Sequence, residues 1–450
     1  MSYADHLLRL ADFAATLRFE DVPADVRERA RWILADTIGC IAAGNRAPPV
    51  RRLARSGVPE ASCLGTTISM PRADAAFVNG VASTWHDLDE GNIHTKGHAG
   101  VQIVPAALAE AEADGLSGER VLLALIAGYE VGCRVYGASA IRLAVHPHGT
   151  YGPMAAAVAI GVLRGVDARS MAGVISVAAG LGVAASRQTL NDGASVRNAY
   201  TGLSGRNAFL AHDLAVAGIT GEHDPFASVF GRIYGTAFAP DAATGGLGSE
   251  WKLMRNYFKL HPSARYVHSA LDLVDRLSPG LDVSAIESVT MDTYAMAATM
   301  ASAEAATPFG TRFSIPIAVA ARFLGVEGRL DDEGIAPLDN PALHALGRRV
   351  AVRQNPAFTS AWPDRQISEM RIATRDGTSH HAVADFIVGE AEHPHPEAAM
   401  ERKFLTLTTP SWGDAAATTL AALKRIETVP DMRALTAGWR VAAARRQETA

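Results

Sequence analysis

The sequence predicts a mainly helical protein with a smaller α+β part, and two observations support this prediction. Up to about residue 269, stretches rich in Ala, Leu, Val and Ile recur with helical spacing and are broken by Gly, Asn or Pro. After about residue 275, short stretches alternate polar and apolar residues, as strands do. We therefore expect a large all-helical domain at 1–269, rejoined by C-terminal helices at 406–450, and an α+β domain at 270–405.

Composition and net charge argue against some classes of function. The chain has 450 residues, 48% of them hydrophobic and 20% charged, which is typical of a soluble globular protein. A net charge of -5 argues against nucleic-acid or membrane-surface partners. No apolar run of membrane-spanning length and no secretory signal are visible, and Cys40, Cys63 and Cys133 are scattered among apolar neighbours. We therefore expect a cytoplasmic protein with reduced cysteines.

The helical domain is expected to begin with an amphipathic helix at 4–19 and a more buried helix at 23–44. Residues 48–72 look like a loop with short extended pieces, and helix resumes at 73–85. Further helices are expected at 103–113, 118–142, 151–164, 168–185 and 202–217. Because these stretches are apolar on most faces, the helices must pack on one another.

The α+β domain is expected from three patterns. Residues 286–294 alternate like a strand, and 369–383 read as two strands around Asp376-Gly377, a hairpin signal. Residues 313–324 read as a buried helix. Helices at 414–424 and 432–445 then end the chain.

The stretch 79–100 concentrates polar side chains between two apolar, alanine-rich flanks. Three interpretations stay open: a metal site, a solvated loop, or an acid/base and anion-binding loop held between buried helices. No HExxH or other fixed ligand spacing supports the metal site. The side chains concerned are His86, Asp87, Asp89, Glu90, His94, Lys96 and His98.

Two further stretches precede small-residue helices. In 145–153, His146 stands in a His/Gly/Pro-rich turn, where free N–H groups can bind a carboxylate and the imidazole can supply a proton. In 195–202, Arg197 can clamp a carboxylate with two hydrogen bonds. A surface turn and an ordinary surface arginine are the plain alternatives.

The fourth polar stretch lies at 256–268, where helical texture gives way to the α+β pattern. It gathers Lys259, His261, Arg265 and His268 within ten residues. Binding sites favour domain junctions, so we expect these side chains to take part in one. Burial of Lys259 between Phe258 and Leu260 would lower its pKa, unless a bound anion keeps it charged.

Taken in order along the chain, these stretches resemble the MmgE/PrpD family, which includes 2-methylcitrate dehydratase, cis-aconitate decarboxylase and iminodisuccinate epimerase. The resemblance rests on the order and spacing of several short segments over nearly the whole length. These are 33–40 (ILADTIGC), 75–83 (AAFVNGVAS) with the HDLDE run, 127–131 (AGYEV), 146–152 (HPHGTYG), 258–262 (FKLHP), 312–317 (RFSIPI) and 401–404 (ERKF).

The resemblance implies an all-helical domain plus an α+β domain, a homodimer, and a cleft that uses no metal or other cofactor. It places Arg197 where many members have lysine, Gly91 where a hydroxyl residue often follows the acidic run, and Ala264 where cysteine is frequent. We expect catalysis from Asp87, His98, His146 and Lys259, and substrate binding from Arg197, Tyr151, His261, Arg265 and His268.

The implied activity is that of a hydro-lyase that removes a proton next to a carboxylate of a small di- or tricarboxylic acid, such as a 2-methylcitrate-like acid. A cis-aconitate-type decarboxylase and an iminodisuccinate-type epimerase are the alternatives within the family. From other classes, a metal-dependent hydrolase and a non-catalytic carboxylate-binding protein stay open.

Overall fold

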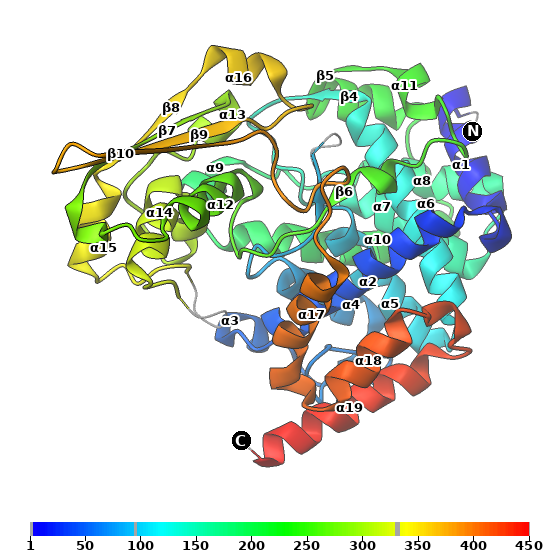
Figure 1. Cartoon of the computed structure of the whole chain (residues 1–450). Coiled ribbons are helices and arrows are strands. Elements are labelled where there is room, and N and C mark those ends of the chain that lie inside the picture. Colours follow the sequence, from blue (N-terminus) through cyan, green and yellow to red (C-terminus); the bar gives the residue numbers. More distant parts are fainter. Residues whose placement is uncertain (1–2, 94–96, 329–333, 450) are drawn as a thin grey trace.

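The computed structural model describes residues 3–93, 97–328 and 334–449, so His94 and Lys96 lie outside the described residues. It confirms the predicted fold class, since a large body of helices carries a smaller α+β part with one four-stranded sheet (Figure 1). Among the described helices, none is long and apolar enough to cross a lipid bilayer.

The helical body is formed by the first part of the chain. Local signals set several of its helix ends: the side chains of Ser117 and Asp167 cap α6 and α8, and left-handed glycines at 115 and 165 end α5 and α7. Its helices are α1 (Asp5–Thr16), α2 (Ala24–Gly44), α3 (Pro48–Arg51), α4 (Arg72–Ser83), α5 (Gly100–Asp114), α6 (Gly118–Gly137), α7 (Gly152–Arg164), α8 (Ala168–Ala179), α9 (Gln188–Asn191), α10 (Val196–Val216) and α11 (Pro240–Thr244).

Helices α4 and α10 cross at very short range. A Cβ atom on Gly80 would stand 2.7 Å from the Gly202 Cα, so two glycines are needed at the crossing. The Thr201 hydroxyl also donates to the Gly80 carbonyl at 2.7 Å. This crossing brings the residues that follow α4 close to the start of α10.

Three short two-stranded ladders connect loops of this body. They are β1 (Ala61–Ser62) with β2 (Ser69–Met70), β3 (Gly91–Asn92) with β6 (Asn256–Tyr257), and β4 (Ser139–Ile141) with β5 (Gly235–Phe238), all antiparallel. The β3–β6 ladder joins two of the predicted functional stretches directly.

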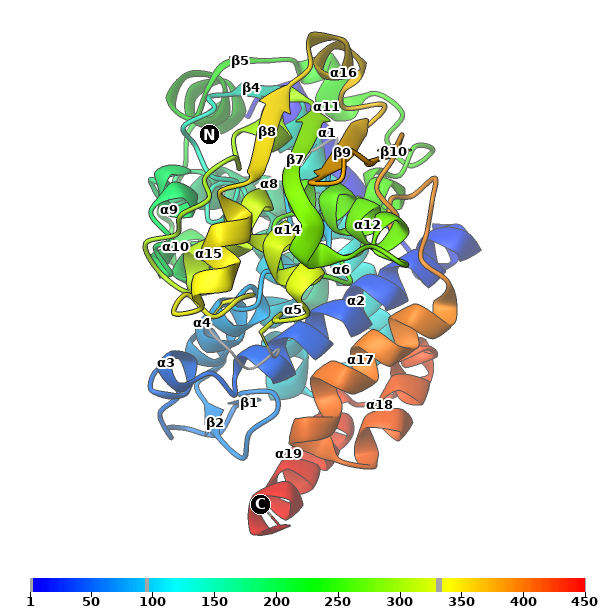
Figure 2. The same ribbon diagram turned by 60° about the vertical axis from the view of Figure 1, so that its left-hand side comes forward.

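The α+β part holds a sheet of order β10-β9-β7-β8, in which only β7 and β8 run parallel. Helices α12 and α14 pack against it, as Figure 2 shows. Its strands are β7 (Ile286–Thr293), β8 (Val350–Gln354), β9 (Ser368–Thr374) and β10 (Ser379–Ala384), and its helices are α12 (His268–Leu277), α13 (Ala295–Ala298), α14 (Ile315–Leu324), α15 (Pro341–Gly347) and α16 (Pro356–Ala361).

The chain ends with α17 (Glu397–Trp412), α18 (Ala415–Leu423) and α19 (Met432–Thr449). Figure 1 shows these helices in orange and red beside α2 and α5, and Phe404, Trp412 and Trp439 belong to the hydrophobic core of the helical body. A separate core, which includes Met291 and Ile372, fills the α+β part. The domain limits at 269 and 405 stay predictions, and α17 runs across residue 405.

Several predicted helix limits are wrong. The helix expected at 118–142 ends at Gly137, because residues 139–141 pair with β5. The helix expected at 168–185 ends at Ala179, before Gly180 and Gly182. Helix α10 begins at Val196, six residues before the predicted start, so Arg197 lies in its first turn.

Candidate active site

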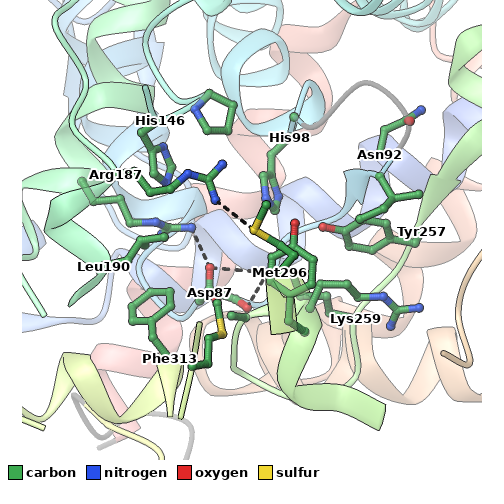
Figure 3. Close-up of a pocket in the computed structure, with 18 of the residues that line it drawn as sticks. Asp87, Asn92, His98, His146, Arg187, Leu190, Tyr257, Lys259, Met296 and Phe313 are labelled. Atoms are coloured by element: carbon green, nitrogen blue, oxygen red, sulfur yellow. Dashed lines mark hydrogen bonds and ion pairs between the residues drawn. The ribbon is translucent and has the colours of Figure 1, made fainter. Parts of the chain in front are cut away.

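A cavity of about 90 Å³ lies where the helical body meets the α+β part (Figure 3). We call it the charged cavity. Six of the residues predicted for the site line it: Asp87, His98, His146, Arg197, Lys259 and Arg265. The others are Asn92, Ile93, Gly97, Pro147, Arg187, Leu190, Tyr257, Ala264, Tyr266, Met296, Met300, Phe313 and Trp362.

The acidic run that follows α4 is buried. Asp87, Asp89 and Glu90 are each 1% exposed or less, which contradicts the interpretation of this stretch as a solvated loop. Pairing of Gly91 with Tyr257 fixes the run beside Lys259, and the α4–α10 crossing fixes it beside Arg197. Buried carboxylates need partners, and nearby cations compensate the charge of this run although some of its oxygens accept no hydrogen bond from the described residues.

Asp87 is held between two cations. Its Oδ1 accepts a hydrogen bond from Arg197 Nη2 at 2.7 Å and lies 3.4 Å from Lys259 Nζ. Its other oxygen, Oδ2, is buried and has no hydrogen-bond partner among the described residues. The backbone at Asp87 is left-handed, with φ of 50°, a conformation that aspartate adopts more readily than most residues. Such sparsely populated conformations concentrate at functional sites.

Three consecutive backbone carbonyls of this run each accept a hydrogen bond from a buried cation. Arg312 Nη1 donates to the His86 carbonyl at 2.9 Å, Lys259 Nζ to the Asp87 carbonyl at 2.8 Å, and Lys403 Nζ to the Leu88 carbonyl at 2.7 Å. The three donors come from the α+β part, the segment after β6, and α17. Cations from three separate segments of the chain therefore fix the backbone around Asp87.

His98 makes its hydrogen bonds through one ring nitrogen. Its Nδ1 lies 2.7 Å from the Glu90 carbonyl oxygen and 2.9 Å from Asp89 Oδ2. Both partners are acceptors, so the hydrogen-bond network assigns the proton to Nδ1 and leaves Nε2 with a free lone pair in the neutral ring. Burial alone would raise the pKa of Asp89, but Lys259 and His98 outweigh burial and hold that pKa below its usual range.

His146 has the opposite arrangement. Its Nδ1 accepts a hydrogen bond from the His148 backbone N–H at 3.1 Å, which places the ring proton on Nε2. Burial and then the nearby Arg197 hold the pKa of His146 well below its usual range. The same two causes lower the pKa of His148. His146 is therefore a neutral ring that offers an N–H donor.

Behind the cavity, Asp36 pairs with Lys403 and accepts a hydrogen bond from the Glu90 backbone N–H at 3.1 Å. Glu90 accepts from the Gly100 N–H at 2.8 Å and from the Tyr129 hydroxyl at 3.1 Å, and burial raises its pKa to about 8. Lys403 donates to Asp36 Oδ1, and burial raises the pKa of Asp36 in spite of this contact. Glu90 and Asp36 thus support the acidic run from behind.

Three residues predicted to bind substrate do not line the charged cavity. Tyr151 is fully buried beneath Gly97, where a Cβ would collide with its hydroxyl. His261 contacts Arg322 Nη2 at 3.2 Å and faces Asp272. His268 is buried and contacts Arg265 Nη1 at 3.3 Å. Arg265 lines the cavity, but its guanidinium is paired with Glu390 at 2.9 Å.

Two lining residues were missed in the sequence. Arg187 forms no ion pair in the part of the chain that the structure describes; its Nη1 contacts Met296 Sδ, and its Nε is buried without a hydrogen-bond partner. It stands among ordinary polar residues, so no local pattern marks it. Tyr257 occupies the space that a side chain at Gly91 would fill, since a Cβ there would collide with the Tyr257 hydroxyl. The Tyr257 phenol thus stands where a hydroxyl side chain at position 91 would lie. The spacing of residues along the sequence does not reveal this contact.

One group of residues has ligand atoms close enough to hold a metal ion. Asp89, His98 and His148 each offer an atom, and these atoms lie within 4.8 Å of one another. Both ring nitrogens of His148 are buried without a partner among the described residues. However, Lys259 Nζ lies 3.9 Å from Asp89 Oδ1, and a fixed ammonium there opposes a second cation.

Comparison with known families matches almost the whole chain. The model of the MmgE/PrpD N-terminal domain matches residues 8–242, and that of the MmgE/PrpD C-terminal domain matches residues 261–427. Residues 243–260, which include Lys259, lie between the two matches.

Known relatives are distant in sequence. A cis-aconitate decarboxylase of Aspergillus terreus (strain NIH 2624 / FGSC A1156) is 24% identical over 442 residues, which is 88% of this chain and 88% of the relative. A cis-aconitate decarboxylase-like protein, oryM, of Aspergillus oryzae is 28% identical over 300 residues, 60% of each chain.

Proposed function

The chain belongs to the MmgE/PrpD family, and from that premise we propose that it is a lyase acting on a small di- or tricarboxylic acid. The observation that carries the proposal is the charge balance of the cavity. Arg187, Arg197, Lys259 and Arg265 line it, whereas Asp87 is the carboxylate among the lining residues. An excess of fixed cations in a buried cavity suits a substrate with several negative charges.

We propose that His98 is the general base. Its Nδ1–H donates to the Glu90 carbonyl beside the Asp89 carboxylate, so Nε2 can accept a proton from the carbon next to a substrate carboxylate. The Asp89 carboxylate then stabilises the imidazolium that forms. Asp87, already paired with Arg197 and Lys259, is a weaker base and serves to orient these two cations.

Removal of that proton pushes an electron pair into the adjacent carboxylate and makes an enediolate-like dianion. Lys259 and Arg197 supply positive charge, and the neutral His146 supplies a hydrogen bond from Nε2–H. In a dehydration, the pair then forms a carbon–carbon double bond and expels hydroxide from the neighbouring carbon. The proton held by His98 can return to that hydroxide, so that water leaves and the base is regenerated.

Decarboxylation is the second candidate, because the relatives above carry the name cis-aconitate decarboxylase. The same cations would hold the substrate while carbon dioxide leaves and a proton is added at carbon. Epimerisation would need only proton removal and return at one carbon. Dehydration and epimerisation share the proposed base, whereas decarboxylation needs a proton donor in its place, and the three outcomes differ in the bond that breaks.

Product analysis separates the outcomes. The protein is incubated with a panel that includes 2-methylcitrate, citrate, cis-aconitate and iminodisuccinate, and NMR follows alkenes, carbon dioxide and epimers. We expect one of these acids to form an alkene with loss of water, and His98→Asn to abolish the reaction while exposed His381→Asn retains it. Absence of any product would contradict the proposal.

Chelation addresses the metal-dependent hydrolase. We expect turnover to survive EDTA dialysis, because the proposed steps use side chains alone. Loss of turnover that divalent metal restores would instead support the Asp89, His98 and His148 group as a metal site. Carboxylic acids that bind without any turnover would favour the non-catalytic binding protein.

A further inference from the structure

A second cavity, of about 710 Å³, adjoins the charged cavity, and we call it the outer cavity. The two cavities share five lining residues: Arg187, Leu190, Met296, Met300 and Phe313. The shared side chains come from α9, α13 and the 3₁₀ turn Phe309–Phe313 or lie next to these elements. These side chains border both cavities, and we call them the neck.

Four of the five neck residues are apolar. These are Leu190, Met296, Met300 and Phe313, of which Met300 and Phe313 are less than a tenth exposed. Farther out, the outer cavity is lined by the apolar residues Leu143, Ala144 and Ala305 together with exposed polar residues, namely Ser186, Gln188, Asn191, Thr299, Ser302 and Glu304. The lining therefore changes from charged in the charged cavity to apolar in the neck, and farther out it combines apolar residues with an exposed polar rim.

Arg187 marks the inner edge of the apolar neck. Its Nη1 lies 3.9 Å from Met296 Sδ, while its buried Nε has no hydrogen-bond partner among the described residues. Arg187 is half-buried, but its Nε is shut off from water without an acceptor, and a carboxylate of a bound ligand would relieve that cost. The acid end of a ligand would then stop at Arg187, directly beside apolar side chains.

An unsubstituted acid of the citrate type would satisfy the cations and leave the neck in contact with water. An apolar substituent beside the last carboxylate would instead cover Leu190, Met296, Met300 and Phe313. Methionine side chains adapt readily to flexible chains, so the neck suits an alkyl group better than a rigid ring.

Resting on the proposed function, we propose that the substrate is a di- or tricarboxylic acid with an alkyl substituent of several carbons. Arg187 binds the carboxylate nearest the substituent, and the chain passes through the neck into the outer cavity. The polar rim then meets the end of the chain, where solvent begins.

Calorimetry with 2-alkylsuccinates from methyl to octyl tests this assignment without any need for turnover. The dissociation constant is expected to fall about fourfold for each added methylene, until the chain reaches the rim. Leu190→Ser should flatten this dependence, whereas Leu210→Ser, on the exposed face of α10, should keep it. Met300→Ser provides a second neck variant should Leu190→Ser fail to fold.

Arg187→Gln should weaken every member of the series by about the same factor, near tenfold, because it removes one charged hydrogen bond common to all. Equal affinities across the series, or a chain-length dependence that survives both neck variants, would overturn the inference while leaving the proposed function intact. Failure of every acid to bind would overturn both.

Discussion

His98 and His146 offer opposite hydrogen-bonding chemistry to one cavity. The Nδ1–H of His98 donates to the Glu90 carbonyl, and the unprotonated Nδ1 of His146 accepts a hydrogen bond from the His148 backbone N–H. One ring therefore presents a lone pair and the other a proton. Burial lowers the pKa of His146 so that it stays neutral at pH 7, where it can donate a hydrogen bond without adding a charge.

Lys259→Ala tests the cation closest to both aspartates. Lys259 is 1% exposed and donates to the Asp87 carbonyl, so its loss removes positive charge where negative charge develops in the reaction. We expect kcat/KM to fall by about 10²-fold to 10³-fold while the far-UV circular dichroism spectrum is retained. Lys252→Ala, near Glu250 on the surface, serves as the control. Near-normal turnover in Lys259→Ala would remove this lysine from the mechanism.

Glu90 makes the stability depend on pH. Burial raises its pKa from 4.5 to about 8 in the native state, so native Glu90 keeps a proton that the unfolded chain has lost. The free energy of unfolding should therefore fall as pH rises from about 4.5 to about 8, with a contribution of up to about 1.4 kcal/mol per pH unit. Above that range the contribution from Glu90 becomes constant.

Urea unfolding at pH 5.5, 6.5 and 7.5 measures this effect. Glu90→Gln keeps the acceptor for the Gly100 N–H and cannot ionise, so its stability should fall less steeply with pH than that of the wild type. Glu119→Gln, at an exposed position in α6, should follow the wild type. Parallel curves for the wild type and Glu90→Gln would contradict the raised pKa.

The segment between α4 and α5 has little regular structure, yet buried cations fix its backbone. Arg312, Lys259 and Lys403 each hold one of three successive carbonyls. This loop contains Asp87 in its left-handed backbone conformation, and few backbone hydrogen bonds to other strands constrain it. Without the three cations its backbone would therefore move to a less strained conformation. Helix α17 contributes to the site in this way although none of its residues lines the charged cavity.

Lys403→Met separates this positioning role from stability. The single variant leaves the buried Asp36 carboxylate without its cation, so the free energy of unfolding should fall by about 3–5 kcal/mol. In the double variant Lys403→Met, Asp36→Asn, most of that stability should return, since both charges are gone. The turnover number should stay low, because the Leu88 carbonyl still lacks its donor. Urea unfolding and steady-state kinetics measure the two effects, and wild-type kcat in the double variant would contradict the role.

Elements with strong local signals were predictable. The Asp376-Gly377 hairpin is formed by β9 and β10, with Gly377 at φ of +88°, as a turn glycine requires. Residues 139–141 were assigned to a helix because their partner strand lies almost 100 residues away. Helix α17, which begins at Glu397, was missed, because the C-terminal helices were expected only at 414–424 and 432–445.

At the scale of the whole molecule, two hydrophobic cores meet at the charged cavity. The helical body supplies Asp87, His98, His146 and Arg197, and the α+β part supplies Met296, Met300 and Phe313. Arg312 ties these parts together, because it donates to both the His86 and the Pro262 carbonyls. A ligand that bridges the two parts should therefore stabilise the native state as a whole.

Citrate-like anions should raise the melting temperature. A ligand at a hundredfold its dissociation constant adds about 2.7 kcal/mol when it binds the native state alone. Arg197→Gln should reduce the shift, whereas Arg206→Gln, on the exposed side of α10, should keep it. No shift with any di- or tricarboxylate at millimolar concentration would contradict an anion-binding cavity. The homodimer stays a prediction that light scattering can test.

Residue types and their order along the chain were enough to predict six residues that line the charged cavity, since clusters of polar side chains in an apolar chain indicate a functional site. They were not enough to tell lining residues from supporting ones. Tyr151 and His268 are buried behind the surface, and Arg187 lies at the neck because α9 folds back toward α13. Such placement depends on tertiary contacts that no local pattern records.

Deuterium exchange tests the central claim most directly, namely that His98 removes a proton next to a carboxylate held by the cations around it. In heavy water, NMR follows that carbon position for a bound di- or tricarboxylic acid, with wild-type protein and His98→Asn at equal ligand saturation. The proposed base predicts loss of the proton signal with the wild type and its retention with His98→Asn. Equal exchange by both proteins, or exchange by neither, would contradict it.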